Sequence, residues 1–355
     1  MNSEVHILIK IVGLGAGNID QLPLGIYRYL KEAQTVFTRT EQHPVIDSLK
    51  NEGIHFISFD EIYEKHEQFE DVYQEIVQIL METHQRESHI VYAVPGHPMV
   101  AERTVALLQE KNADIEIAGG QSFLDAMLTA IKLDPINGFQ LLDGSSLQAK
   151  DLQIAQPIII GQVYDQFSAS HVKLTLMEKY PDEHVVMVVQ NAGMPNQSIR
   201  SCPLYELDHG WTVNNLTSIY VPPTDQLLRE FWKLREIFAT LRGENGCPWD
   251  KKQTYQSLTK KMIEEVNEYI EAVENEDIDN MIEELGDVLL HVMLASQIAI
   301  DQDDFSIDDV IHAVASKMIR RHPHVFGDVK AASAEEAYAY FLQAKAEEKI
   351  QNDTT

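Results

Sequence analysis

The sequence changes character at residues 221–225, Val-Pro-Pro-Thr-Asp, and this change constrains the fold more than any other feature. Before this point, apolar runs alternate with helical patterns, whereas the segments after it show helical periodicity. Consecutive prolines fix the backbone and remove N–H donors, which favours a linker over a regular element. We therefore predict an α/β domain at residues 1–222, a linker at 223–227 and an all-α domain at 228–355.

The first domain has the alternation of strands and helices that is typical of layered α/β folds. The predicted strands are residues 5–12, 54–59, 89–94, 114–118, 157–163 and 184–189. The predicted helices between them are residues 24–33, 69–82, 101–111, 122–133 and 168–180. In the second domain the predicted helices are residues 226–242, 256–274, 278–300, 307–321 and 334–350.

The chain of 355 residues is strongly acidic, with 56 Asp and Glu against 28 Lys and Arg and a net charge of −28. This balance argues against a nucleic-acid polymer as partner, because such binding rests on clustered cations. Only Cys202 and Cys247 are present, which favours a reducing compartment. No apolar run approaches the roughly 18 residues of a spanning helix. We therefore expect a cytoplasmic protein with no membrane partner.

The acidic residues are concentrated in one stretch. Residues 262–316 contain 16 Asp and Glu and no Lys or Arg. Most charge runs are solvated helix faces, but this one contains two similar arrangements, Glu264-Glu265-Val-Asn-Glu268 and Glu283-Glu284-Leu-Gly-Asp287. Because residues three or four apart share a helix face, each helix presents a pair of carboxylates. A short acidic turn between the helices predicts an antiparallel hairpin that brings the pairs together.

The carboxylates that these spacings select are Glu265, Glu268, Glu284 and Asp287. At about 100° per residue, Glu265 lies near the edge of the apolar stripe of its helix and Glu264 almost opposite. Carboxylates gathered in a partly apolar setting repel one another unless a cation keeps them ionised. Oxygen donors without cysteine favour a hard cation, Mg²⁺ or Mn²⁺, and such ions typically meet phosphorylated substrates.

Five ordered motifs in the second domain resemble the MazG family of nucleoside triphosphate pyrophosphohydrolases over about residues 228–350. The motifs are Gly246-Cys247-Pro248-Trp249-Asp250, Gln253-Thr254, the two acidic arrangements above, and Arg320-Arg321-His322-Pro323-His324-Val325-Phe326. The resemblance implies an all-α fold that dimerises. It also implies hydrolysis of a nucleoside triphosphate to the monophosphate and pyrophosphate, with the four selected carboxylates as metal ligands.

The same resemblance assigns further residues to the substrate. Phosphate contacts would fall on Lys261, Lys317, Arg320 and Arg321, which flank the acidic stretch, and further substrate contacts on Trp249, Phe341 and Lys345. The two arginines have an alternative role as cations at a helix C-terminus, and Trp249 is either a core anchor or part of the nucleotide pocket. Phe341 stands where the family usually has tryptophan. We expect His291 to be a packed core histidine rather than a partner of a metal ligand.

Glycines follow three predicted strands of the first domain. Gly13, Gly15 and Gly17 follow the first strand, Gly96-His97 follows another, and Gly119-Gly120 a third. These segments resemble the tetrapyrrole (corrin/porphyrin) methylase family over about residues 5–222. The resemblance implies two α/β lobes that bind S-adenosylmethionine between them, with cofactor contacts from Gly13, Gly15, Gly17, Gly96 and His97. His97 stands where the family's Pro-Gly-Asp-Pro motif has its acid.

Three hypotheses about function remain open from the sequence. The first is a Mg²⁺-dependent nucleoside triphosphate pyrophosphohydrolase fused to a methylase-like domain. The second is methyl transfer to a tetrapyrrole or other small molecule, with the helical domain serving dimerisation. The third is a regulatory module whose first domain senses a ligand. The sequence does not select the preferred nucleotide.

Overall fold

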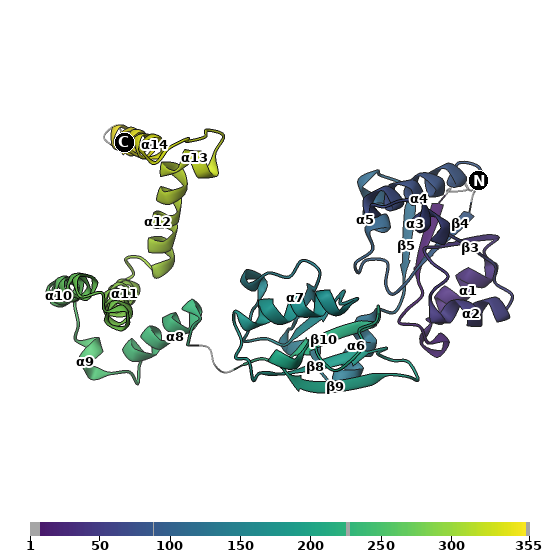
Figure 1. Ribbon diagram of the computed structural model, residues 1–355, viewed down its shortest axis with the longest axis horizontal. Helices are drawn as coiled ribbons and strands as arrows, with labels where there is room; N and C mark the ends of the chain where they lie inside the picture. Colours follow the sequence, from purple (N-terminus) through teal and green to yellow (C-terminus); the bar gives the residue numbers. More distant parts are fainter. Residues whose placement is uncertain (1–7, 88, 225–227, 353–355) are drawn as a thin grey trace. The chain divides into compact units, whose positions relative to one another are not determined.

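The computed structural model describes residues 8–87, 89–224 and 228–352 and confirms the predicted fold class (Figure 1). The chain divides into an amino-terminal unit, residues 1–225, and a carboxy-terminal unit, residues 226–355. The first contains two α/β lobes and the second is all-helical. Among the described residues, no helix is long and apolar enough to cross a membrane.

The first lobe is built on a five-stranded parallel sheet of order β3-β2-β4-β1-β5. The strands are β1 (Leu8–Gly13), β2 (Thr35–Thr38), β3 (Phe56–Ser58), β4 (His89–Val94) and β5 (Ile115–Gly119). The helical segments are η1 (Ile19–Gln21), α1 (Leu24–Glu32), α2 (Pro44–Asn51), α3 (Asp60–Lys65), α4 (Phe69–His84) and α5 (Arg103–Glu110). Ile9 and Ile11 pack on one face with α4 and α5, while Val12 and Leu14 pack on the other with α1 and α2. Helices on both faces explain why β4 is apolar from Ile90 to Val94 and why only Lys10 interrupts the apolar residues of β1.

The second lobe is a mixed sheet of order β6-β7-β10-β8-β9, in which β6 and β7 are parallel and the other neighbours antiparallel. Its strands are β6 (Gln140–Asp143), β7 (Ile158–Gly161), β8 (Val185–Gln190), β9 (Ser198–Pro203) and β10 (Thr217–Val221). Its helical segments are α6 (Phe123–Ile131), η2 (Pro135–Asn137), η3 (Ala149–Asp151), α7 (Gln166–Met177) and η4 (Leu204–Glu206). Met127 on α6 is fully buried against Ile159 and Val189 of the sheet.

The carboxy-terminal unit consists of helices joined by short turns. They are α8 (Phe231–Arg242), α9 (Pro248–Lys251), α10 (Tyr255–Glu274), α11 (Ile278–Asp301), α12 (Ile307–Arg321), α13 (Pro323–Phe326) and α14 (Ala334–Asn352). Thr254 and Ser306 begin α10 and α12 with capping boxes, which satisfy free N–H groups at those ends. The core joins Phe238 of α8, Leu258 of α10 and Leu294 of α11.

Several elements differ from the predictions for physical reasons. Strands β2, β6, β9 and β10 were not predicted, because none of them contains a long apolar run. The helix predicted at 101–111 begins only at Arg103, because Ala101 has a left-handed φ of 53°. The helix predicted from 168 begins two residues earlier, where Asp165 caps it. Residues 5–7 of the first predicted strand and residues 226–227 lie outside the described residues.

Candidate functional site

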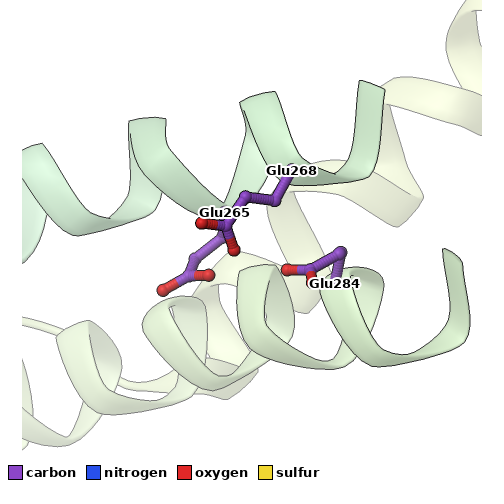
Figure 2. A group of neighbouring side chains, drawn as sticks. All are labelled: Glu265, Glu268 and Glu284. Carbon is purple, nitrogen blue, oxygen red and sulfur yellow. The ribbon is translucent and has the colours of Figure 1, made fainter. Parts of the chain in front are cut away.

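Three of the predicted ligands lie together between α10 and α11 (Figure 2). Glu265 and Glu268 are three residues apart and share one face of α10, and Glu284 faces them from α11. One carboxylate oxygen from each side chain lies within 4.8 Å of the other two. The antiparallel hairpin thus concentrates negative charge at one place.

Glu284 has the least favourable environment of the three carboxylates. It is only 7% exposed, and its Oε2 has no hydrogen-bond partner. Burial, followed by the charges of Glu268 and Asp287, raises the pKa of Glu284. A buried and unpaired carboxylate oxygen is costly, and a divalent cation would satisfy it. The donor set, which is all carboxylate oxygen, fits Mg²⁺ or Mn²⁺.

Two further side chains border this group. Asp287 is not among the three carboxylates that meet within 4.8 Å, although its charge contributes to the raised pKa of Glu284. His291 is 4% exposed, and its Nε2 lies 3.4 Å from Oε1 of Glu265. The expectation of a packed core histidine is therefore incomplete, because the buried ring also contacts a candidate ligand.

The predicted phosphate-binding cations lie at two places. Lys261 of α10 holds its Nζ 5.0 Å from the ring centroid of Trp249, which is 55% exposed and outside the core of the described chain. Arg321 lies over the ring of Phe341 at 5.5 Å. The remaining predicted cations are Lys317 and Arg320 on α12 and Lys345 on α14. Trp249 and Phe341 are therefore each in contact with a predicted phosphate-binding cation.

The cations at the end of α12 are separated from the carboxylates of their own chain. Figure 1 shows α13 and α14 at the end of α12 that lies away from the α10–α11 pair. Helix α12 has 15 residues, so it is about 22 Å long at 1.5 Å per residue. One chain therefore does not bring Arg320 and Arg321 to the acidic group.

The α10–α11 hairpin also leaves large apolar side chains uncovered. On α10 these are Ile263, Val266, Ile270 and Val273, and on α11 they are Ile278, Ile282, Leu285 and Leu289. Their exposed fractions range from 41% to 66%. On both helices they recur every three or four residues, which makes a continuous stripe along one face. An apolar surface of this kind marks an interaction site.

The glycine loops of the amino-terminal unit meet at the carboxyl ends of β1, β4 and β5. Gly15 and Gly96 pair through two backbone hydrogen bonds of 3.1 and 3.0 Å. A Cβ on Gly13 would lie 2.3 Å from the carbonyl oxygen of Gly96, and one on Gly17 would press on Pro44 and Met194. A Cβ on Gly96 would meet nothing within 4 Å. Close packing thus explains Gly13 and contributes at Gly17, whereas Gly96 borders open space and its φ of 66° accounts for the glycine.

Unpaired polar atoms surround these loops. His43 is 7% exposed, and its Nε2 lies 3.1 Å from the carbonyl oxygen of Gly15, while Nδ1 has no partner. Gln121 Oε1 is likewise buried and unpaired. His97 accepts the Met99 N–H at Nδ1. Buried acceptors without donors fit a ligand rich in N–H and O–H groups, as S-adenosylmethionine is. Sequence reasoning missed His43 and Gln121, because no local pattern signals their burial.

Two α/β lobes with glycine loops, followed by a helical hairpin that gathers carboxylates, define a methylase-type domain joined to a pyrophosphohydrolase-type domain. The family model of the tetrapyrrole (corrin/porphyrin) methylases matches residues 9–208, and that of the MazG nucleotide pyrophosphohydrolase domain matches residues 253–326. The chain belongs to the tetrapyrrole methylase family and carries a MazG domain after it, which confirms both resemblances.

Known proteins are similar to the whole chain or to one unit. YabN of Bacillus subtilis (strain 168), an uncharacterized protein, is 52% identical over 98% of this chain and 72% of its own length. The MazG nucleoside triphosphate pyrophosphohydrolase/pyrophosphatase of Thermotoga maritima is 48% identical over 34% of this chain and 45% of its own length. The Escherichia coli (strain K12) nucleoside triphosphate pyrophosphohydrolase is 41% identical over 34% of this chain and 46% of its own length.

One solved structure supports the fold of the first unit. A cobalamin biosynthetic enzyme, cobalt precorrin-4 methyltransferase, superposes with a TM-score of 0.50 over 62% of this chain and 97% of that chain. The two sequences are 17% identical. At this identity the comparison establishes the two-lobed fold of the amino-terminal unit and nothing about its substrate.

The buried imidazole of His43 makes stability depend on pH. Burial lowers the pKa of His43 from 6.5 to about 4, so between these values the unfolded chain binds a proton that the folded chain does not. The free energy of unfolding therefore falls as pH drops through this window, by about 2 kcal/mol between pH 7 and pH 5. In urea unfolding, the free energy of unfolding of His43→Gln should not show this decrease of about 2 kcal/mol between pH 7 and pH 5. An equal pH slope in both proteins would show that His43 titrates normally.

Proposed function

We propose that the carboxy-terminal unit hydrolyses nucleoside triphosphates to the monophosphate and pyrophosphate, with Mg²⁺ or Mn²⁺ held by Glu265, Glu268, Glu284 and Asp287. The observation that carries this proposal is the group of three carboxylates with the buried, unpaired Oε2 of Glu284. A bound divalent ion supplies a water of lowered pKa and charge neutralisation at phosphate oxygens. The reaction type follows the activity for which the Thermotoga and Escherichia relatives are named.

Different residues of the chain bind the metal ion, the phosphates and the nucleotide in this proposal. The carboxylates hold the ion, and His291 supports Glu265 through the 3.4 Å contact. Lys261, Lys317, Arg320, Arg321 and Lys345 bind phosphate oxygens, since charge-assisted hydrogen bonds are what a triphosphate requires. Trp249 and Phe341 line the nucleotide pocket. Pocket shape selects the base.

The complete site needs two copies of the chain. The exposed stripes of α10 and α11 fit a second hairpin, which would form a four-helix bundle with an apolar centre. Because the end of α12 that carries Arg320 and Arg321 lies away from the hairpin of the same chain (Figure 1), a partner is needed to bring these two arginines to the carboxylates. We therefore propose a homodimer.

A second candidate function belongs to the amino-terminal unit, which we propose binds S-adenosylmethionine. The unpaired acceptors of His43 and Gln121 support this proposal. Beside the glycine loops lies a cleft of about 410 Å³, whose lining includes Met99, Asp143 and Tyr164 and so draws on both lobes. This cleft suits a methyl acceptor, either a tetrapyrrole or another small molecule. Ligand sensing without methyl transfer is the regulatory alternative.

Replacing Glu284 tests the metal site. In the full chain, Glu284→Gln should lower Mg²⁺-dependent release of pyrophosphate from a panel of triphosphates by more than about 100-fold, since even residues that only orient metal ligands cost 10–100-fold. Mg²⁺ should raise the Tm of the wild type and not that of the variant. Glu264→Gln is the matched control, because it removes the same charge from the position next to Glu265, but Glu264 is exposed and outside the group. Equal losses in both variants would refute the site.

Placing a charge in the apolar stripe tests the dimer. Ile270 is 48% exposed in the single chain, and Ile270→Glu should yield monomers in light scattering and abolish hydrolysis, because a buried unpaired charge costs several kcal/mol. Glu271→Gln should stay dimeric, because Glu271 is an exposed residue of the same helix outside the apolar stripe. A monomeric and fully active wild type would contradict the proposal.

Calorimetry separates the candidate roles of the amino-terminal unit. S-adenosylmethionine should bind the wild-type chain and bind His43→Phe at least about tenfold more weakly, because that variant cannot accept a hydrogen bond in the loop. Binding together with methyl transfer to an added acceptor would support the methyltransferase. Binding without methyl transfer would support the sensor, and the absence of binding would contradict both the methyltransferase and the sensor role.

A further inference from the structure

One carboxylate holds both arginines at the end of α12. Glu348 of α14 accepts hydrogen bonds from Arg320 Nε at 3.1 Å, and from Arg321 Nε at 3.0 Å and Nη2 at 2.7 Å. These bonds lower the pKa of Glu348, so the carboxylate is ionised near neutral pH. Arg320 and Arg321 are adjacent on a helix and diverge by about 100°. An acid from another helix is therefore needed to bring their guanidinium groups together.

The contact fixes Arg321 from two sides. Glu348 and Phe341 are seven residues apart and share one face of α14. The centroid of the Phe341 ring lies 5.5 Å from the guanidinium of Arg321, and Glu348 accepts a hydrogen bond from Nε of the same guanidinium. The side chains of Arg321 and Glu348 are only 17% and 19% exposed. Arg321 thus has one orientation in which both contacts are made.

The contact leaves several N–H donors of both arginines without a hydrogen-bond partner. Glu348 uses Nε of each residue and one terminal nitrogen of Arg321. Within the described part of the chain, neither Nη1 has a hydrogen-bond partner, and the Arg320 side chain remains 57% exposed. Arginine has five N–H donors, so most of them stay free. Glu348 thus occupies the Nε–Nη2 edge of Arg321, whereas on Arg320 it occupies Nε alone.

We propose that Glu348 is a positioning residue for the triphosphate, which fixes Arg320 and Arg321 so that their terminal N–H groups face the phosphates. This inference rests on the proposed function, because it takes the two arginines as phosphate ligands. Preorganised donors bind a ligand without losing side-chain freedom at that step. Glu348 therefore acts on substrate affinity rather than on the chemical step.

Two substitutions separate geometry from charge. Glu348→Gln removes the charge, and Glu348→Asp keeps it but shortens the side chain, so it no longer reaches both arginines. Glu347→Gln is the matched control, because Glu347 is exposed on the same helix and bonds only Gln343 among the described residues. For the full chain, kcat and KM would be measured with the best triphosphate of the panel. Binding of inorganic tripolyphosphate would be measured by calorimetry.

The proposal expects KM and the Kd for tripolyphosphate to rise about tenfold in both Glu348 variants. It expects kcat within about twofold and no change in Glu347→Gln. A lower KM in Glu348→Gln would overturn the proposal, because the carboxylate would then compete with phosphate. Unchanged constants in Glu348→Asp would also overturn it, since charge alone would suffice. Tripolyphosphate binding keeps this test separate from the proposed function, which fails only if the wild type hydrolyses no triphosphate.

Discussion

Repulsion among the carboxylates between α10 and α11 is the constraint on which the carboxy-terminal unit depends. Glu284 is buried with an unpaired oxygen and faces Glu265 and Glu268 across the hairpin. Such an arrangement costs stability in the isolated chain, and proteins retain costs of this kind where function needs them. The same hairpin exposes an apolar stripe on each helix. A bound cation would relieve the repulsion among the carboxylates, and a second apolar surface would cover the stripe. Both features of the hairpin therefore favour binding partners.

The glycine loops of the amino-terminal unit contain two kinds of glycine position. Its glycines divide into those that let two backbones approach, such as Gly13 against Gly96, and those that border open space, such as Gly96 itself. The first group is needed for packing whatever the loop binds. The unpaired atoms of His43 and Gln121 are the observations that support the proposed ligand site.

The sequence predicted the two-unit fold and the group formed by Glu265, Glu268 and Glu284, because helical periodicity determines which residues share a face. It did not predict β10 or the contact of His291 with Glu265, because both depend on partners far along the chain. Glu348 carried no signal at all, since it stands among residues of mixed charge and meets Arg320 and Arg321 only when α14 packs on α12. Local spacing thus predicts which side chains share a face, and only tertiary contacts reveal which side chains from other elements touch them.

The length of α12 has a consequence for how the protein responds to its own abundance. A helix of 15 residues carries the arginines away from the carboxylates of the same chain. On the proposed dimer, every working site is then shared between two polypeptides. Dilution below the dissociation constant of the dimer removes whole sites instead of slowing each one, so turnover per chain increases with concentration until dimerisation is complete. In the proposed dimer, the helix would thereby couple the cellular concentration of the protein to its specific activity.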